Sequence, residues 1–153
     1  ENEEDLRPLV CLASRCPGAS ACVRLLVEHR ASVNEPGEHG SVPLLYAARS
    51  LDVGNLRELL SRGADPNCSP RPHDEEADEV LAHRPADVTP LSVVLRLLKT
   101  LPTRREDKWS QAAPAVRELV KAGGKLTHAA FAKLEVLSSS GQWSAVREAL
   151  QDA

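Results

Sequence analysis

One nine-residue segment recurs along the chain, and its spacing constrains the fold more than any other feature. Residues 26–34 (LVEHRASVN) align with residues 59–67 (LLSRGADPN) at an offset of 33 residues, and residues 119–127 form a third copy. Each copy contains an apolar pair, two polar residues, a small residue and a turn. Periods of this length are typical of small units that stack side by side and share one continuous core.

A second element, led by a proline, recurs upstream of each copy. Proline suits the first position of a helix because its φ already fits and its missing N–H has no partner there. Thr89 precedes one of these prolines and is a good helix N-cap, whereas Arg7 and Val42 at the same place are poor ones. The element occupies residues 7–13, 42–48 and 89–95. We therefore predict a pair of helices in each copy.

Glycine closes the second helix in two of the three copies. Gly63 and Gly123 follow helical runs, where a left-handed cap favours a residue without a Cβ. Arg30 stands at the equivalent place in the first copy, and a left-handed arginine would cost roughly 1 kcal/mol. We expect the first cap to be a mild departure from the pattern.

Together the two elements resemble the ankyrin repeat. That family has a T-P-L-H-x-A-A helix, a second helix ending in L-L, a G-A-D-x-N turn and a period of 33 residues. Residues 40–67 match closely, and the resemblance covers roughly residues 5–127. It implies an all-α fold in which helix-turn-helix units stack into an ankyrin-repeat solenoid. With aromatics at only 3%, the core must be built from Leu, Val and Ala, which argues against a β-sandwich.

The chain is predicted to be a single ankyrin-repeat domain with three repeats, two inserts and a C-terminal cap. The last unit lacks the proline, and we expect a degenerate helix pair that covers the open end of the stack. Trp143 is expected to pack in or beside the core of this cap, and Trp109 either folds back onto the array or stands exposed. The boundaries are about 5–34, 35–67 and 87–127 for the repeats, 68–86 and 102–114 for the inserts, and 128–153 for the cap.

Charge and motifs argue against catalysis and against binding to nucleic acid or membranes. The net charge of −3 offers no basic excess for a phosphate backbone. No apolar run approaches the roughly 18 residues that a membrane span needs. No nucleophile motif, phosphate loop or close pair of zinc ligands is present. We expect a protein that is not an enzyme and that uses no cofactor or metal.

One cluster combines basic and aromatic residues, within the second insert. It consists of Arg104, Arg105, Lys108 and Trp109. Such a cluster can meet a phosphate or an acidic partner, but a solvated loop is the alternative that we favour.

The four cysteines indicate a compartment. No two of them form a C-x-x-C pair; they are Cys11, Cys16, Cys22 and Cys68. We expect reduced, buried thiols that act as small hydrophobes. Reduced thiols favour an intracellular location, cytoplasmic or nuclear. The chain contains no methionine, from which we expect a fragment of a larger protein or a processed chain.

The ankyrin resemblance implies a non-catalytic protein–protein interaction module. In that family the concave groove is formed by the finger tips and the exposed side of each first helix, and it binds a protein or a peptide. The positions of this chain that match are Arg15, Pro36, Glu38, His39, Ser41, Leu45, Tyr46, Arg49, Ser50, Ser92 and Arg96. We expect the fragment itself to be monomeric.

Two questions about this groove stay open. Tyr46 is either a binding anchor, since aromatic and arginine side chains dominate binding hot spots, or it packs between helices. Arg15, Arg49 and Arg96 come from successive first helices, and if they align they form a basic stripe that prefers an acidic peptide. The alternative function is an architectural spacer that packs against other domains of the parent chain.

Overall fold

The computed structural model describes residues 7–37, 40–70, 88–100, 106–126 and 142–151. All regular elements in these ranges are α-helices, and the ranges contain no strand. The helices are α1 (Arg7–Arg15), α2 (Ser20–Glu28), α3 (Pro43–Ser50), α4 (Val53–Ser61), α5 (Pro90–Thr100), α6 (Glu106–Lys121) and α8 (Gln142–Gln151). The prediction of an all-α fold is confirmed for these residues.

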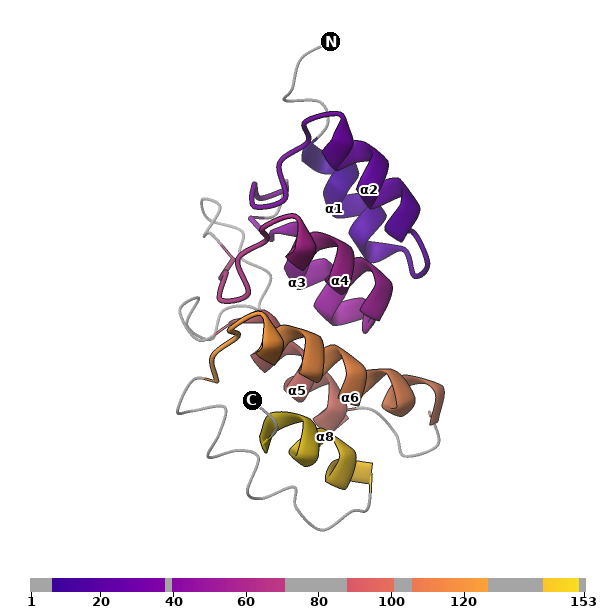
Figure 1. Cartoon of the computed structure of the whole chain (residues 1–153), viewed down its shortest axis with the longest axis vertical. Coiled ribbons are helices and arrows are strands. Elements are labelled where there is room, and N and C mark those ends of the chain that lie inside the picture. Colours follow the sequence, from indigo (N-terminus) through magenta and orange to yellow (C-terminus); the bar gives the residue numbers. More distant parts are fainter. Residues whose placement is uncertain (1–6, 38–39, 71–87, 101–105, 127–141, 152–153) are drawn as a thin grey trace.

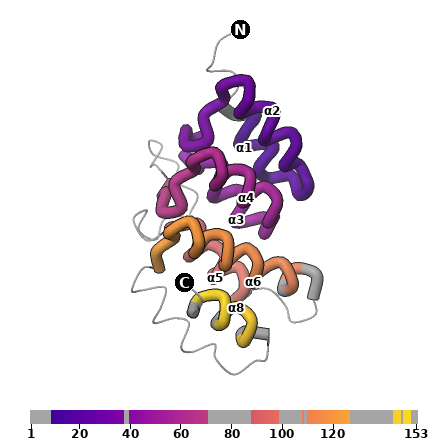
Figure 2. Tube along the Cα trace, in the orientation of Figure 1, coloured from indigo at the N-terminus to yellow at the C-terminus, as the bar shows by residue number. Residues whose placement is uncertain are grey.

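The first six helices form three pairs that follow one another along the long axis of the molecule (Figures 1 and 2). Within each pair the two helices pack together: α1 on α2, α3 on α4, and α5 on α6. The first helices of neighbouring pairs also contact each other, α1 with α3 and α3 with α5. The second helices do the same, α2 with α4 and α4 with α6, and α8 packs on α6. We call α1, α3 and α5 the first-helix layer, and α2, α4 and α6 the second-helix layer.

The starts of the helices follow the sequence signals. Pro43 is the first residue of α3, and Val42 before it makes no side-chain cap. At the start of α5, the Oγ1 of Thr89 accepts a hydrogen bond from the backbone N–H of Ser92 at 3.3 Å. In return, the Oγ of Ser92 accepts from the backbone N–H of Thr89 at 2.9 Å. This reciprocal pair satisfies two donors that a helix start leaves open, and it confirms Thr89 as an N-cap.

The three turns after the second helices share one geometry. Gly63 and Gly123 have φ of 86° and 88°, and Arg30 has φ of 68°. After each of them, the next residue's N–H bonds back to the carbonyl at the helix end, at 3.0 Å in the first two copies and 2.8 Å in the third. Arg30 is therefore left-handed, as the alignment predicts, and it lacks the freedom that makes glycine cheap there.

An asparagine in each of the first two turns binds the following turn. The Nδ2 of Asn34 donates to the carbonyl of Gly63 at 2.9 Å, and its Oδ1 accepts from the N–H of Asp65 at 2.9 Å. Asn67 repeats this arrangement one unit later, with the carbonyl of Gly123 at 3.0 Å and the N–H of Lys125 at 2.7 Å. The recurrence of asparagine at an offset of 33 residues thus has a structural cause.

One core cluster of buried residues runs through the whole stack. It is built from leucine, valine and alanine, as the low aromatic content predicts. Burying one such leucine or valine is worth about 1.5–3 kcal/mol. Each helix contributes at least one fully buried side chain, among them Val10, Val23, Leu44, Leu56, Leu91, Val116 and Val146.

The second insert differs from its prediction. The solvated loop that we favoured there is wrong for Lys108, because residues 106–114 form the first part of α6. Lys108 is half-buried, and its Nζ donates to the carbonyl of Ser50 at 3.2 Å. The insert therefore lengthens the second helix of its pair and brings a cation to the end of α3.

Several predicted features lie outside the described residues. They are the first insert from residue 71 onward, Arg104 and Arg105, the first helix of the C-terminal cap, and the side chains of Trp109 and Trp143. The second half of the cap is described as α8. Its Val146 and Ala149 are buried in the common core.

Candidate protein-binding surface

Three of the predicted binding residues are buried beneath the surface that they were expected to form. Ser41, Leu45 and Ser92 have exposed fractions of 6%, 3% and 4%. Leu45 packs in a small cluster with Val42 and Val88, and Ser92 is occupied as the capping partner at the start of α5. These three side chains can support a binding surface from below, and a partner could not reach them directly.

The segment before α3 forms a turn that lies against α1. The N–H of Gly37 donates to the carbonyl of Ser41 at 3.1 Å, and that carbonyl also accepts from the Sγ of Cys11 at 3.7 Å. A Cβ added at Gly37 would come within 3.0 Å of the Cys11 Sγ, so the contact is close. Pro36 is half-buried beside this turn. The predicted residues Glu38 and His39 lie outside the described residues.

Arg15 and Tyr46 lie together at the surface where α1 meets α3. The guanidinium carbon of Arg15 is 5.8 Å from the centre of the Tyr46 ring. Arg15 is exposed and Tyr46 is half-buried, so Tyr46 packs partly between the helices and part of its side chain stays accessible. A cation over an aromatic ring at an exposed site is worth about 0.5–1 kcal/mol. The contact therefore links α1 and α3 through two side chains at the surface.

Arg49 and Arg96 are exposed on the neighbouring first helices, α3 and α5. When the helix-leading prolines are aligned, Arg49 and Arg96 occupy the same position, and Arg15 comes one residue later in its helix. Because α1 packs on α3 and α3 packs on α5, the three arginines belong to adjacent helices of one layer.

Lys108, which lies on α6, brings a further cation to the first-helix layer. The repeat pattern does not assign Lys108 to the binding surface. Its Nζ reaches the carbonyl of Ser50, the last residue of α3. A cation at this end complements the negative end of the helix dipole. The Oγ of Ser50 donates to the carbonyl of Ala47 at 3.0 Å, so Ser50 is also engaged within the fold. The basic–aromatic cluster in the sequence included Lys108, but nothing there indicated its position on a helix.

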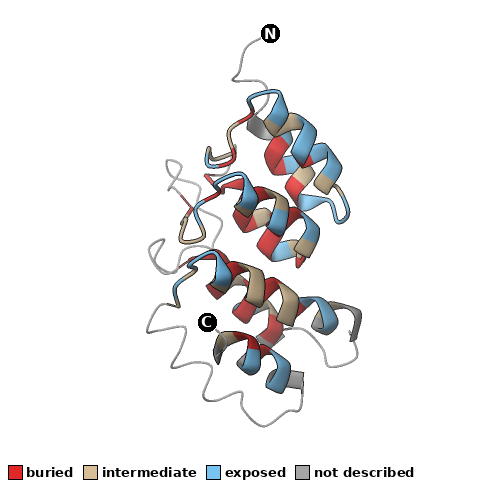
Figure 3. Ribbon diagram, in the orientation of Figure 1, coloured by how far each residue is buried: buried red, intermediate tan, exposed pale blue. Residues whose placement is uncertain are grey.

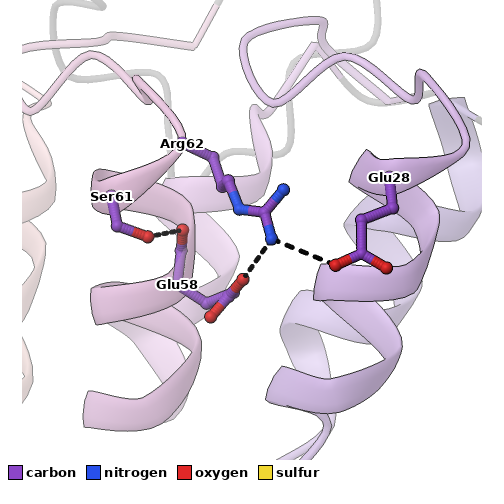
Figure 4. Close-up of polar contacts among 4 residues, drawn as sticks. All are labelled: Glu28, Glu58, Ser61 and Arg62. Atoms are coloured by element: carbon purple, nitrogen blue, oxygen red, sulfur yellow. Dashed lines mark hydrogen bonds and ion pairs between the residues drawn. The ribbon is translucent and has the colours of Figure 1, made fainter.

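The second-helix layer carries charges that pair with one another. An amino nitrogen of Arg62 lies 3.3 Å from a carboxylate oxygen of Glu58 and 3.3 Å from one of Glu28, so it bridges α4 and α2 (Figure 4). Arg57 pairs with Glu118 of α6 at 2.8 Å. This hydrogen bond from Arg57 holds the pKa of Glu118 below its ordinary value. The salt bridges recorded between described residues thus lie on the second-helix layer.

The cysteines are free, and they divide into two kinds. Desolvation by burial raises the pKa of Cys11 to about 11 and that of Cys68 to about 12. Such thiols are nearly all protonated at neutral pH and react slowly. Cys16 and Cys22 are exposed, so the prediction that the thiols are buried is wrong for these two.

No group of three or more metal-ligating side chains occurs within the described ranges. In the same ranges, no helix has both the length and the apolar character that crossing a bilayer requires. The chain matches no protein-family model, and no curated protein is detectably similar to it.

Proposed function

We propose that this chain is an ankyrin-repeat array that binds a protein or peptide, without catalysis, through the first-helix layer and the turns beside it. The 33-residue period, the paired helices and the asparagine contacts between successive turns support the assignment to ankyrin repeats. In such an array the concave side carries the binding surface, and stacked repeats present it as one extended face.

The observation that carries the proposal is the Arg15–Tyr46 pair. Arginine and tyrosine are enriched among the residues that dominate binding energy. Here the two side chains come from neighbouring helices and already contact each other at an exposed place. A surface ordered in advance loses less side-chain entropy when a partner binds.

The distribution of charge favours an acidic partner. The chain has a net charge of −3, yet the first-helix layer presents Arg15, Arg49 and Arg96 at its surface. Complementary charge across an interface raises the association rate and selects among partners. We propose that an acidic protein segment docks along the arginines of the first helices.

Affinity capture from cell extract tests the proposal. Three folded forms of the chain are compared: the unmodified chain, the double variant Tyr46→Ala with Arg49→Glu, and the control Arg24→Glu. Arg24 is an exposed arginine on α2, so its reversal changes the charge equally on the other layer. Circular dichroism verifies that each form is helical.

We expect the unmodified chain and the control to hold a protein that the double variant loses. If all three forms hold the same proteins, the first-helix layer is not the binding surface. If none holds any protein, the architectural role as a spacer replaces binding as the better proposal.

A further inference from the structure

One end of the stack presents an apolar face. Leu9 and Leu12 on α1 have exposed fractions of 45% and 51%, and Leu25 on α2 has 52%. These are the large hydrophobic side chains that are exposed within the described residues. Cys16, directly after α1, and Cys22, within α2, are exposed as well. We call Leu9, Leu12, Cys16 and Cys22 the end face. Leu25 does not belong to it, because its equivalents in the other pairs, Glu58 and Glu118, are only partly buried and form ion pairs. In Figure 3, many residues of α2 carry the colour of exposed positions.

The same positions are buried in the other two helix pairs. Aligning the first helices on their prolines, and the second helices on their recurring segments, gives the equivalents of the end face. For Leu9, Leu12, Cys16 and Cys22, these are Leu44, Ala47, Leu51 and Asn55 in α3–α4, with exposed fractions of 1%, 0%, 3% and 0%. In α5–α6 they are Leu91, Val94, Leu98 and Ala115, with 1%, 0%, 1% and 0%.

The preceding helix pair is what covers these positions inside the stack. α3 and α4 contact α1 and α2, and α5 and α6 contact α3 and α4. Within the described helices, the molecule therefore contains two interfaces of the kind to which the end face would contribute one side. In both interfaces, the structure that packs against the equivalent positions is the preceding helix pair, stacked in the same register.

The first internal interface has a polar component. The Nδ2 of Asn55 donates to the carbonyl of Cys16 at 3.0 Å and to that of Ser14 at 3.4 Å. The carboxylate of Asp52 accepts from the N–H of Gly18. These bonds satisfy carbonyls at the end of α1 and an N–H of the turn that follows it, groups that helix ends otherwise leave open.

The second internal interface is apolar at the same two positions. Ala112 and Ala115 stand where α4 has Asp52 and Asn55, and both alanines are fully buried. The first helix pair has Ala19 and Cys22 at these positions. At these two positions the end face resembles the third helix pair, which packs on the second without polar side chains there. It therefore suits a helix pair that needs no hydrogen bonds from these positions.

We propose that the end face binds a helix hairpin of the array's own build, which offers the surface that α3–α4 offers to α5–α6. The occupant is aliphatic at the contact and stacks in the register that the chain uses twice. The proposal is independent of whether the first-helix layer binds a protein.

The exposed cysteines report directly on coverage of the end face. Cys16 and Cys22 belong to it, whereas Cys11 is buried, Cys68 is half-buried, and burial raises the pKa values of both. The thiolate is the reactive form of cysteine. A thiol reagent such as Ellman's reagent at pH 8 therefore reacts mainly with Cys16 and Cys22, and only slowly with Cys11 and Cys68.

The test adds the proposed occupant to the full chain. A copy of residues 35–67, followed by one glycine, is placed ahead of Glu1. The glycine restores the spacing of nine residues between the turn asparagine and the helix proline that Asn34 and Pro43 show. The added segment contains no cysteine. The control is the same extended chain with Leu12→Glu, which sets a charge against the added hairpin.

We expect the extension to slow the reaction of Cys16 and Cys22 by about tenfold or more, and Leu12→Glu to restore the original rate. In the unextended chain Leu12 is exposed, so Leu12→Glu should leave its helix content and its reaction rates unchanged. Equal thiol rates in the extended and unextended chains would overturn the proposal.

A second copy of the chain is the competing occupant, and sedimentation velocity on the unextended chain distinguishes it. We expect a monomer. A dimer that protects Cys16 and Cys22 and that Leu12→Glu dissociates would mean that two copies cover each other, and it would also overturn the proposal.

Discussion

The helix pairs α1–α2 and α3–α4 share one sequence pattern, but they differ in what surrounds them. The leucine after the helix-leading proline is 45% exposed as Leu9 and 1% exposed as Leu44. The difference arises because α3–α4 has a helix pair on each side, whereas among the described elements α1–α2 has one on a single side. The place of a pair in the stack therefore decides what a given repeat position contributes to stability.

The largest contrast is expected at the leucine near the end of each second helix. Leu59 is fully buried, whereas the equivalent Leu26 is only partly buried against the same core. Leu59→Ala should lower the free energy of unfolding by about 2–5 kcal/mol, because a cavity is added to the lost burial. Leu26→Ala should cost clearly less. Urea unfolding at 25 °C measures both, and equal losses would contradict the comparison.

A smaller contrast is expected where α4 reaches across to α1. Asn55→Ala removes the donor for the carbonyls of Ser14 and Cys16, and it should cost about 1–3 kcal/mol. The equivalent Cys22 is exposed, so Cys22→Ala should change stability by less than about 0.5 kcal/mol. If both substitutions have the same effect in urea unfolding, the polar contact contributes nothing.

The left-handed turns should respond in opposite directions. Arg30→Gly should raise the free energy of unfolding by roughly 1 kcal/mol, because glycine adopts the observed φ without strain. Gly63→Ala should lower it by a similar amount, and a Cβ there would meet no atom within 4 Å. The loss would therefore come from the backbone alone. Thermal unfolding of the two variants gives the signs, and a loss for Arg30→Gly would disprove the strain.

The smallest effect is expected from the salt bridge between the second helices. Arg57 holds the pKa of Glu118 below its ordinary value of about 4.3. The native chain thus binds fewer protons at this site than the unfolded chain, so its stabilising effect is present at neutral pH. It is lost as the pH falls below the ordinary pKa and then through the lowered pKa of Glu118. Glu118→Gln should flatten this acid dependence and change stability at pH 7 by less than about 1 kcal/mol. An unchanged acid profile would show that the pair is not coupled to folding.

Much of the fold could be predicted from the sequence because its determinants are local. Proline at the helix starts and glycine at Gly63 and Gly123 mark the ends of elements by their own backbone preferences. Thr89 caps a helix through atoms three residues away. The recurrence of asparagine at Asn34 and Asn67 indicates the 33-residue period. The hydrogen bonds of these two side chains to the next turn could not be predicted from it.

The side chains of the candidate site were harder to predict, since burial depends on neighbouring helix pairs. Leu45 and Ser92 were assigned to a surface by their places in the repeat, and the structure buries both. Cys16 and Cys22 sit at positions that are buried in the other pairs, and here they are exposed. The contact between Arg15 and Tyr46 joins two helices, so no pattern within one helix could indicate it.

The most direct test of binding through the first-helix layer is hydrogen–deuterium exchange on the chain alone and with the captured partner. We expect the partner to slow exchange in α1, α3 and the turn at residues 36–37 and 40–41, and to leave α2 and α4 unchanged. Slower exchange confined to α2 and α4, with none in α1 and α3, would contradict the proposed binding surface.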